Sequence, residues 1–467
     1  MSSAPAQRRP GALSFIASAT VWLATAAGCA VAPATLPPHA LPSIPTAWAR
    51  ELPLRTEPLS QGWRIFGDAL LVELVDAAAE ANNDVRSAEA NLRRARALRE
   101  QSAASLKPTL TGGASALHSR PAQGAAGDSF ELGLDASWEL DIFGQGRHGL
   151  AAAEADVRAQ AAALAAVQVS VAAEVALNYL QMRGFEERLR IVQSHIAAYE
   201  GTLRLAQQRE RAGLVSATDI ERFRSALAQL RAQQAALAGE AARQRHALAV
   251  LTARPVAQID ATMAPSRALP EAPAAFALDT PLATLQRRPD VREAEEQLLA
   301  AIDRLGQEQA ARFANPRLAS SLSWSALTLG SLGSGGAAAS LLANLAQPLF
   351  DGGQRDARIA ALQAGVDAAQ AKLHGRAAGA LRDVEDALAQ LGAAEARITS
   401  LDEAARAEDL ALNLVRNRYE AGLADGLALL DAQRTLLQVL DQWTLARIDR
   451  ALAQVRLYKA LGGGWKT

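Results

Sequence analysis

The chain has 467 residues, of which half are hydrophobic but only 4 % are aromatic, and its formal net charge at pH 7 is −1. A near-neutral balance supplies no basic field for nucleic acid, and a single cysteine excludes an internal disulfide framework and most metal fingers. Much of the apolar content is alanine, which together with Leu, Gln, Glu and Arg is typical of long, closely packed helices.

The N-terminus has the pattern of a targeting segment. A pair of arginines precedes an apolar stretch over residues 11–27, which is short for a membrane span. Small residues lead directly to Cys29, as a lipoprotein signal peptidase requires, so we predict a signal peptide over residues 1–28 and lipidation of Cys29. The alternative is an ordinary signal peptide with an incidental cysteine, because Ala26 stands where bacterial lipoprotein signals usually have leucine.

The segment after the signal peptide, residues 29–65, is rich in Pro, Ala and Leu and has the character of an extended tether. Helical periodicity begins near Gly67 and continues to about Lys107, where Pro108 ends it. No segment beyond the signal peptide has 18 uncharged apolar residues, so no transmembrane helix is expected.

A β-hairpin is predicted over residues 109–141. From Phe130 to Asp141, apolar and polar residues alternate strictly, as in a strand with one apolar and one acidic face. A weaker strand pattern covers Thr109 to Ser119, and the residues between the two carry the glycine and proline of a loop.

A long helical hairpin is predicted over residues 146–251. The first tract, Arg147 to Arg211, contains no proline and corresponds to roughly 100 Å of helix. Gly213 breaks the pattern, and a second tract begins at Ala217. The next segment, residues 254–288, is rich in proline and is predicted to be irregular.

The second half of the chain repeats the first, so repeat 1 spans residues 66–253 and repeat 2 residues 289–461, followed by a tail of residues 462–467. Repeat 2 has the same order of a helix, a β-hairpin (317–350) and a long helical hairpin (355–461). Four pairs of matching landmarks have nearly constant offsets of 206, 208, 208 and 209: Asp84 and Asp290, Pro108 and Pro316, Arg147 and Arg355, Gly213 and Gly422. This spacing is too long for a solenoid repeat and indicates duplication of a whole structural unit.

These elements predict a particular architecture, an α+β membrane protein. Alternation over about ten residues is typical of membrane barrel strands, but four strands cannot close a barrel, and an open strand edge in lipid leaves backbone groups unsatisfied. Several chains must therefore share one barrel. Seven-residue spacing of Leu429, Leu436 and Trp443 also indicates coiled-coil-like helix packing. A soluble protein in which a small sheet caps a helical bundle is the alternative.

The chain resembles the TolC-like outer-membrane efflux channels, in particular the lipoprotein branch that serves RND-type drug pumps. The resemblance covers nearly the whole mature chain and depends on residues 287–295, 137–144, 348–353, 430–434 and 457–465. It implies a homotrimer whose twelve strands, four from each chain, form one outer-membrane β-barrel continued by a long periplasmic α-helical barrel. It also implies an equatorial domain from the inter-repeat segment, a periplasmic adaptor (membrane fusion) protein and an inner-membrane RND-type transporter as partners, and contact with outer-membrane lipid.

The helix turns at residues 211–219 and 420–429 are expected to form the periplasmic tips. Adaptor contact is expected at the tip residues Gly213, Leu214, Gly422 and Leu423. Leu427, Asp431 and Arg434 fall at i, i+4 and i+7 on one helix face, so threefold symmetry would make an apolar ring and a carboxylate ring. The resemblance implies that these rings constrict the pore and that Arg434 and Tyr419 hold it closed through bonds between helices. The alternative is ordinary seam packing by Leu427 and a surface pair of Asp431 with Arg434.

The two repeats differ at this tip, because subtracting 209 from the three gate positions leads to Thr218, Arg222 and Ser225. On the strands, four acidic residues are expected to line the lumen, where they favour cations or simply solvate a water-filled bore: Glu131, Asp135, Glu139 and Asp141.

We predict a passive exit duct for drugs or other small toxic compounds, with no catalytic residues, no cofactor and no metal site, because the six histidines are scattered and no nucleophile–base set is evident. An outer-membrane channel for metal ions or for proteins is an alternative, as is a periplasmic coiled-coil protein without a pore. Liposome conductance distinguishes a channel from the last of these.

Overall fold

The computed structural model describes residues 35, 43–49, 59–120, 122, 126–264, 267–270, 280–332 and 336–463. Cys29 and the predicted signal peptide lie outside the described residues, so both remain predictions. The chain divides into two compact units. The first contains Leu92–Gln160 and Glu293–Leu373, and the second contains Ala161–Arg292 and His374–Thr467 together with residues 41–91.

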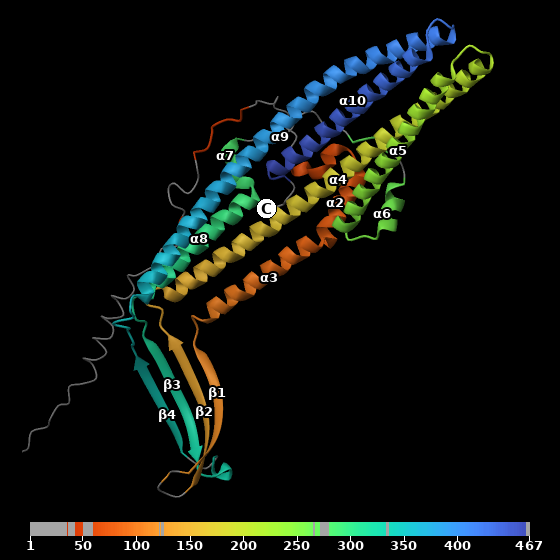
Figure 1. Cartoon of the computed structure of the whole chain (residues 1–467). Coiled ribbons are helices and arrows are strands. Elements are labelled where there is room, and N and C mark those ends of the chain that lie inside the picture. Colours follow the sequence, from red (N-terminus) through yellow and green to blue (C-terminus); the bar gives the residue numbers. More distant parts are fainter. Residues whose placement is uncertain are drawn as a thin grey trace, which may run out of the picture. The chain divides into compact units, whose positions relative to one another are not determined.

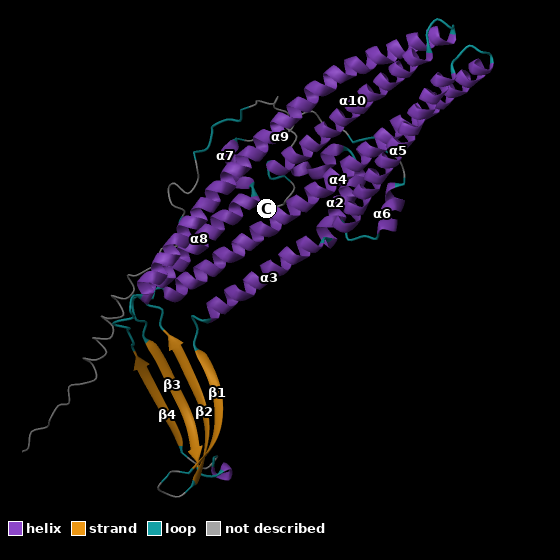
Figure 2. Ribbon diagram, in the orientation of Figure 1, coloured by secondary structure: helices purple, strands orange, loops and turns teal. Residues whose placement is uncertain are grey.

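Among the described residues, the first unit contains one four-stranded antiparallel sheet (Figures 1 and 2), as expected of each chain. Its strands are β1 (Thr109–Ser119), β2 (Gly127–Glu139), β3 (Arg317–Ala326) and β4 (Ala337–Asn344), and they follow one another in chain order across the sheet. Each hairpin belongs to one repeat, and the central pairing of β2 with β3 joins the two repeats. β1 and β4 are therefore the two edges of the sheet.

The second unit contains most of two long helical hairpins of matching dimensions. α4 (Gln145–Arg211) and α9 (Gln354–Glu420) each have 67 residues, whereas α5 (Ala217–Leu251) and α10 (Gly426–Ala460) each have 35. No proline interrupts any of the four helices. This equality of lengths agrees with the duplication inferred from the sequence.

The helix predicted from Gly67 to Lys107 is interrupted in the structure. Asn82, with φ −62° and ψ 135°, separates α2 (Ala69–Ala81) from α3 (Asn83–Ala104). The Asn82 side chain accepts hydrogen bonds from the backbone N–H groups of Asp84 and Val85 and donates one to the Leu251 carbonyl, at 3.0 Å. The asparagine therefore caps the start of α3 and the end of α5 at once.

Repeat 2 has the equivalent break at Arg288. This residue, with φ −69° and ψ 124°, separates α7 (Pro281–Arg287) from α8 (Pro289–Ala310), and the proline after it favours the extended backbone. The inter-repeat segment is also less irregular than predicted, because α6 (Val256–Met263) and α7 both lie within residues 254–288. α6 begins directly after Pro255 and α7 begins at Pro281, and proline is tolerated at a helix start.

The largest hydrophobic core lies in the second unit and takes residues from both repeats. Repeat 1 contributes Leu71, Leu74 and Leu180, and repeat 2 contributes Leu391 and Val455, all of them buried. α4 also contains an 18-residue window that is long and apolar enough to cross a membrane by composition, of which 33 % is buried in this fold. Residues of α4 between Val171 and Met182 pack into this core.

Candidate functional site

The two turns between the long helices have the same geometry. Gly213 and Gly422 have positive φ values of 74° and 77°, a conformation that glycine adopts without steric cost. In each turn the next residue donates its N–H to a carbonyl five residues back: Leu214 to Arg209 at 2.9 Å, and Leu423 to Arg418 at 2.8 Å. This is a Schellman helix ending. It leaves the leucine side chains 75 % and 71 % exposed, so both tips present an apolar residue to solvent.

The predicted gate residues lie near the start of α10. Asp431 and Arg434 form an ion pair of 3.3 Å within the helix, and their side chains are 54 % and 67 % exposed. Leu427 is 41 % exposed. An exposed pair at this spacing contributes only a few tenths of a kcal/mol to stability, about as much as an ordinary surface pair. All three side chains therefore remain available for contacts outside the chain.

Tyr419 has a different environment from the other three predicted gate residues. It is buried among Leu412, Leu429 and Leu436, and its hydroxyl has no hydrogen-bond partner among the described residues. The Arg209 guanidinium, from α4, stacks over the Tyr419 ring with 4.6 Å between the guanidinium carbon and the ring centroid.

Arg209 also clamps the end of α9, a role that the sequence analysis missed. Its Nη1 and Nη2 donate to the carbonyl oxygens of Tyr419 and Glu420, both at 2.8 Å. A cation at a helix C-terminus is favourable because the last carbonyls lack partners within the helix and carry the negative end of the helix dipole. Arg209 thus links repeat 1 to repeat 2 at the tips.

A second residue that the sequence analysis did not name, Tyr199 on α4, is buried close to Asp431 and Arg434. Burial raises the pKa of Tyr199 to about 12, while the charge of Arg434 lowers it and that of Asp431 raises it. No sequence pattern singled out Tyr199 or Arg209. In the sequence, a buried tyrosine such as Tyr199 has the same pattern as any other core residue of a helix. The acceptors of Arg209 are backbone carbonyls, which every residue type has, so the sequence does not mark them.

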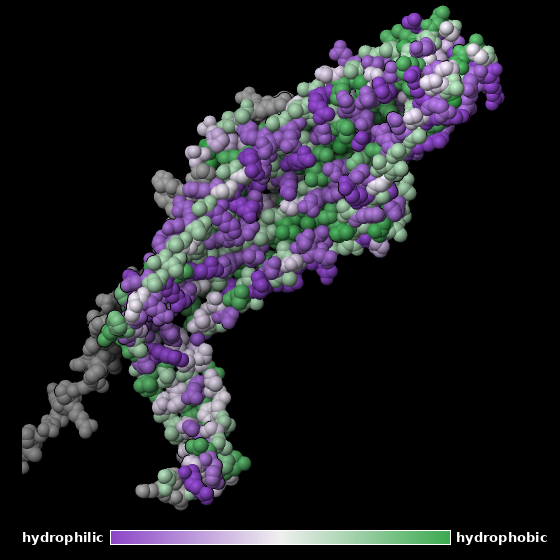
Figure 3. Space-filling view, in the orientation of Figure 1, coloured by the Kyte–Doolittle hydropathy of each residue, from purple (hydrophilic) through white to green (hydrophobic). Residues whose placement is uncertain are grey.

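The sheet has one apolar and one polar face. Register pairs place Leu132 opposite Trp324 and Trp138 opposite Leu318, whereas Glu131 lies opposite Ser325 and Asp135 opposite Ser321. These aromatic residues lie toward opposite ends of the sheet, as in the girdles of membrane barrels. In Figure 3 the strands carry hydrophobic and weakly hydrophilic colours, while strongly hydrophilic residues are dense along the helices.

The four acidic residues predicted to line the lumen do not share one environment. Glu131, Asp135 and Glu139 are exposed on the polar face of β2. Asp141 lies beyond the end of β2, and its carboxylate accepts a hydrogen bond from the Arg147 backbone N–H at 2.8 Å near the start of α4. Its side chain is only 12 % exposed, so in this chain Asp141 acts as a helix-capping group.

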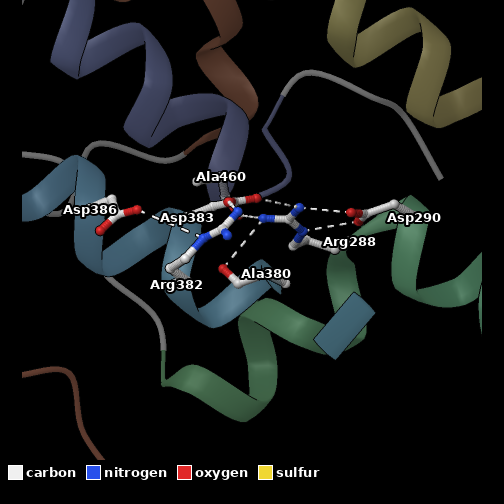
Figure 4. Close-up of polar contacts among 7 residues, drawn as sticks. All are labelled: Arg288, Asp290, Ala380, Arg382, Asp383, Asp386 and Ala460. Atoms are coloured by element: carbon white, nitrogen blue, oxygen red, sulfur yellow. Dashed lines mark hydrogen bonds and ion pairs between the residues drawn. The ribbon is translucent and has the colours of Figure 1, made fainter. Parts of the chain in front are cut away.

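A polar cluster surrounds the buried side chain of Arg288, the break residue of repeat 2 (Figure 4). Its guanidinium binds both carboxylate oxygens of Asp290, at 2.9 and 2.7 Å, and one oxygen of Asp383, at 3.2 Å. It also donates to the Ala460 carbonyl at 3.1 Å, so it caps the end of α10 as Asn82 caps the end of α5. A cavity of about 310 Å³ lies beside the cluster, lined in part by Arg288, Asp383 and Lys459.

Within the described residues, no group of three or more His, Cys, Asp and Glu side chains is arranged to hold a metal ion. The features described above are helix ends, ion pairs and sheet faces. They can hold, open or line a passage, but their geometry presents no nucleophile beside a base.

Comparison with known proteins gives a consistent result. A family model described as "outer membrane efflux protein" matches residues 74–254 and 281–463. The toluene efflux pump outer membrane protein TtgF of Pseudomonas putida is 30 % identical over 422 residues, which cover 88 % of this chain and 87 % of TtgF.

Solved structures agree with this match. The outer-membrane channel OprN superposes with a TM-score of 0.83 at 32 % identity, covering 93 % of this chain and 97 % of OprN. The open state of the MtrE outer membrane channel of Neisseria gonorrhoeae gives a TM-score of 0.81 at 26 % identity, covering 93 % and 98 % of the two chains. The neighbouring channels are trimers with a β-barrel and a long α-helical barrel, as the sequence analysis expected for this chain.

Proposed function

The chain belongs to the outer membrane efflux protein family, and from that membership we propose that three copies form the exit duct of a tripartite efflux pump. The duct lies in the outer membrane and extends into the periplasm. The observation that carries the proposal is the four-stranded sheet with one apolar face and two open edges. Such a sheet is stable in lipid only when further copies complete a closed barrel.

The apolar face of the sheet contacts lipid and the polar face lines the lumen. Glu131, Asp135 and Glu139 then face water and favour cations entering the bore. Asp141 continues the acidic pattern of the sequence, but its carboxylate caps α4. We therefore leave it out of the proposed lumenal set.

The periplasmic tips carry the gate. Leu427 forms an apolar ring and Asp431 a carboxylate ring in the trimer, while Arg434 binds a carboxylate of a neighbouring helix in place of its partner within α10. Their exposure in the single chain supports this proposal, because these side chains are not committed to its core. Tyr419, near the end of α9, is the fourth residue of the proposed gate. Arg209 stacks on its ring and donates a hydrogen bond to its carbonyl oxygen.

Docking of a periplasmic adaptor protein on the tips opens the gate. Leu214 and Leu423, on the turns formed by Gly213 and Gly422, are the exposed apolar contacts that such a partner would cover. The adaptor in turn connects the duct to an inner-membrane RND-type transporter, which supplies the energy, since the duct itself conducts passively.

Drugs and other small toxic compounds are the proposed cargo. TtgF is named for toluene efflux, which supports small apolar molecules as one class of substrate. A lipid anchor on Cys29 would add a second attachment to the outer membrane.

Single-channel conductance in planar bilayers tests the gate. The wild-type channel is expected to show a small resting conductance, and the combined Asp431→Ala and Arg434→Ala substitutions should raise it several-fold. Thr218→Ala, at the repeat-1 position that corresponds to Leu427, serves as the matched control and should leave conductance unchanged. An unaltered conductance in the double variant would show that the gate lies elsewhere.

A further inference from the structure

The two helical hairpins correspond residue by residue at the tips. The offset is constant there, because 420 − 211 = 209 for the ends of α4 and α9 and 422 − 213 = 209 for the turn glycines. Helix lengths of 67 and 35 residues are the same in both repeats, so no insertion disturbs this correspondence. A contact made by one repeat therefore has an identifiable equivalent in the other.

One face of α4 is used for contact with repeat 2 within the chain. Leu205 packs against the cluster formed by Leu412, Tyr419, Leu429 and Leu436. Thr202 Oγ1 accepts a hydrogen bond from Gln433 Nε2 at 3.2 Å. One turn beyond Leu205, Arg209 caps the end of α9 through the two carbonyls described above. The face thus combines an apolar residue with a terminal arginine.

The same face on α9 is exposed in the single chain. Adding 209 to Leu205 and Arg209 leads to Leu414, which is 57 % exposed, and to Arg418, which is also exposed. Leu410, one turn before Leu414, is 62 % exposed and extends the apolar stripe. Repeat 1 presents its face to repeat 2, whereas the described part of the chain holds no third repeat to receive the face of repeat 2.

We propose that this α9 face, Leu410, Leu414 and Arg418, docks on the α4–α5 hairpin of a second copy of the chain, with the Arg418 guanidinium donating to the carbonyls of Glu210 and Arg211. These acceptors follow from the same offset, since 419 − 209 = 210 and 420 − 209 = 211. The proposal rests on the trimeric duct proposed above and deepens it by naming contacts between its subunits.

The proposed contact of Arg418 differs in one respect from the contact that Arg209 makes within the chain. Arg209 stacks on an aromatic ring, but the equivalent of Tyr419 in repeat 1 is Glu210, an exposed carboxylate. The cation–π contact is thus replaced by an ion pair, while both arginines cap a helix C-terminus. The tips of a trimer would then carry six arginine clamps, three within chains and three between chains.

Thiol crosslinking in outer membranes tests this arrangement, using a bismaleimide whose span matches an extended arginine side chain. Arg418→Cys combined with Arg211→Cys should give covalent dimers and trimers on denaturing gels. Arg209→Cys combined with Glu420→Cys is the intrachain equivalent and should react without forming oligomers. Arg406→Cys with Arg211→Cys is the negative control, because position 406 lies about 18 Å before Arg418 along α9. The single-cysteine variants show any contribution from Cys29.

Absence of covalent oligomers in Arg418→Cys with Arg211→Cys, while the intrachain pair reacts and the trimer survives mild solubilisation, would overturn the docking proposal alone. Equal oligomer yield from the Arg406→Cys pair would also overturn it, because the contact would then lack the specified position. A chain that migrates as a monomer after mild solubilisation would contradict the proposed trimeric duct itself.

Discussion

Replacing Arg288 with alanine should strongly destabilise the protein. The side chain is buried and donates hydrogen bonds to the carboxylates of Asp290 and Asp383. It also donates one to the Ala460 carbonyl in the last turn of α10. Removing one partner from a fully buried ion pair costs about 3–5 kcal/mol, but Asp290 and Asp383 are 26 % and 42 % exposed, so solvent reduces the cost here to about 2 kcal/mol. The Ala460 carbonyl also loses its cap. We expect Arg288→Ala to lower the free energy of unfolding by about that amount at pH 7.

The pH dependence of this effect identifies its cause. Burial by itself raises the pKa of Asp290, but the hydrogen bonds and charge of Arg288 outweigh burial and hold that pKa below its usual range. In the wild type, Asp290 therefore stabilises the fold above about pH 4, and this contribution is lost as the pH falls through the lowered pKa. In Arg288→Ala, burial is opposed only by the backbone hydrogen bonds from Val291 and Asp290, so the pKa of the Asp290 carboxyl rises and its ionised form stabilises the fold less. The difference in stability between variant and wild type should be largest at pH 7 and should shrink below about pH 5.

Denaturant-induced loss of far-ultraviolet ellipticity measures these differences, at fixed protein and detergent concentrations because the trimer dissociates on unfolding. Arg382→Ala is the matched control from the same cluster: its side chain is 73 % exposed and pairs with Asp383 at 3.2 Å, so the change should cost less than about 1 kcal/mol. Equal stability losses in the two variants, or a loss for Arg288→Ala that is the same at pH 7 and pH 4, would refute this account of the cluster.

Three further predictions follow from other contacts. Arg209→Ala removes two carbonyl caps and a cation–π contact and should raise single-channel conductance by loosening α9, whereas Arg209→Lys should have a smaller effect because lysine lacks the planar fork. Glu131→Gln with Asp135→Asn should reduce cation selectivity, measured as a shift in reversal potential under a salt gradient, and an unchanged potential would exclude a lumenal position for these residues. Asn82→Ala should lower the free energy of unfolding by about 1–2 kcal/mol, because it removes the cap of α3 and the bond to Leu251, whereas Asn83→Ala, on the adjacent exposed position, should cost less in the same denaturation assay.

Much of the architecture could be predicted from the sequence because its signals are local. Alternation along Phe130–Glu139 and the glycines at 213 and 422 mark the strand and the helix turns without reference to any other part of the chain. The break at Arg288 can also be predicted from the sequence, because Pro289 follows it and proline disfavours a helical conformation of the residue before it. Applied to Asn82 through the repeat offset, the same reasoning would have predicted the break between α2 and α3.

The site roles that the sequence does not predict depend on the partner of each side chain, whether that partner is near or far along the chain. Arg209 binds carbonyl oxygens 210 and 211 positions away, and any residue type supplies a carbonyl. Asp141 continues the alternation of β2, yet its carboxylate is used by the helix that follows. Periodicity alone cannot distinguish these cases, because it specifies the face of a residue and not its partner.

The divergence between repeats at the tip has a physical rationale in the trimer. Near the start of α10, Asp431 pairs with Arg434, whereas the corresponding position on α5 holds Arg222, which pairs with Asp219 on its own helix at 3.9 Å. If both repeats carried the aspartate, six carboxylates would converge when the tips close, and their repulsion would oppose closure. With Arg222 in place of a second aspartate, the proposed ring has only the three Asp431 carboxylates, so repulsion opposes closure of the tips less. Duplication therefore supplies matched helices and, under the proposed gate, the difference between the copies reduces the repulsion that opposes closure.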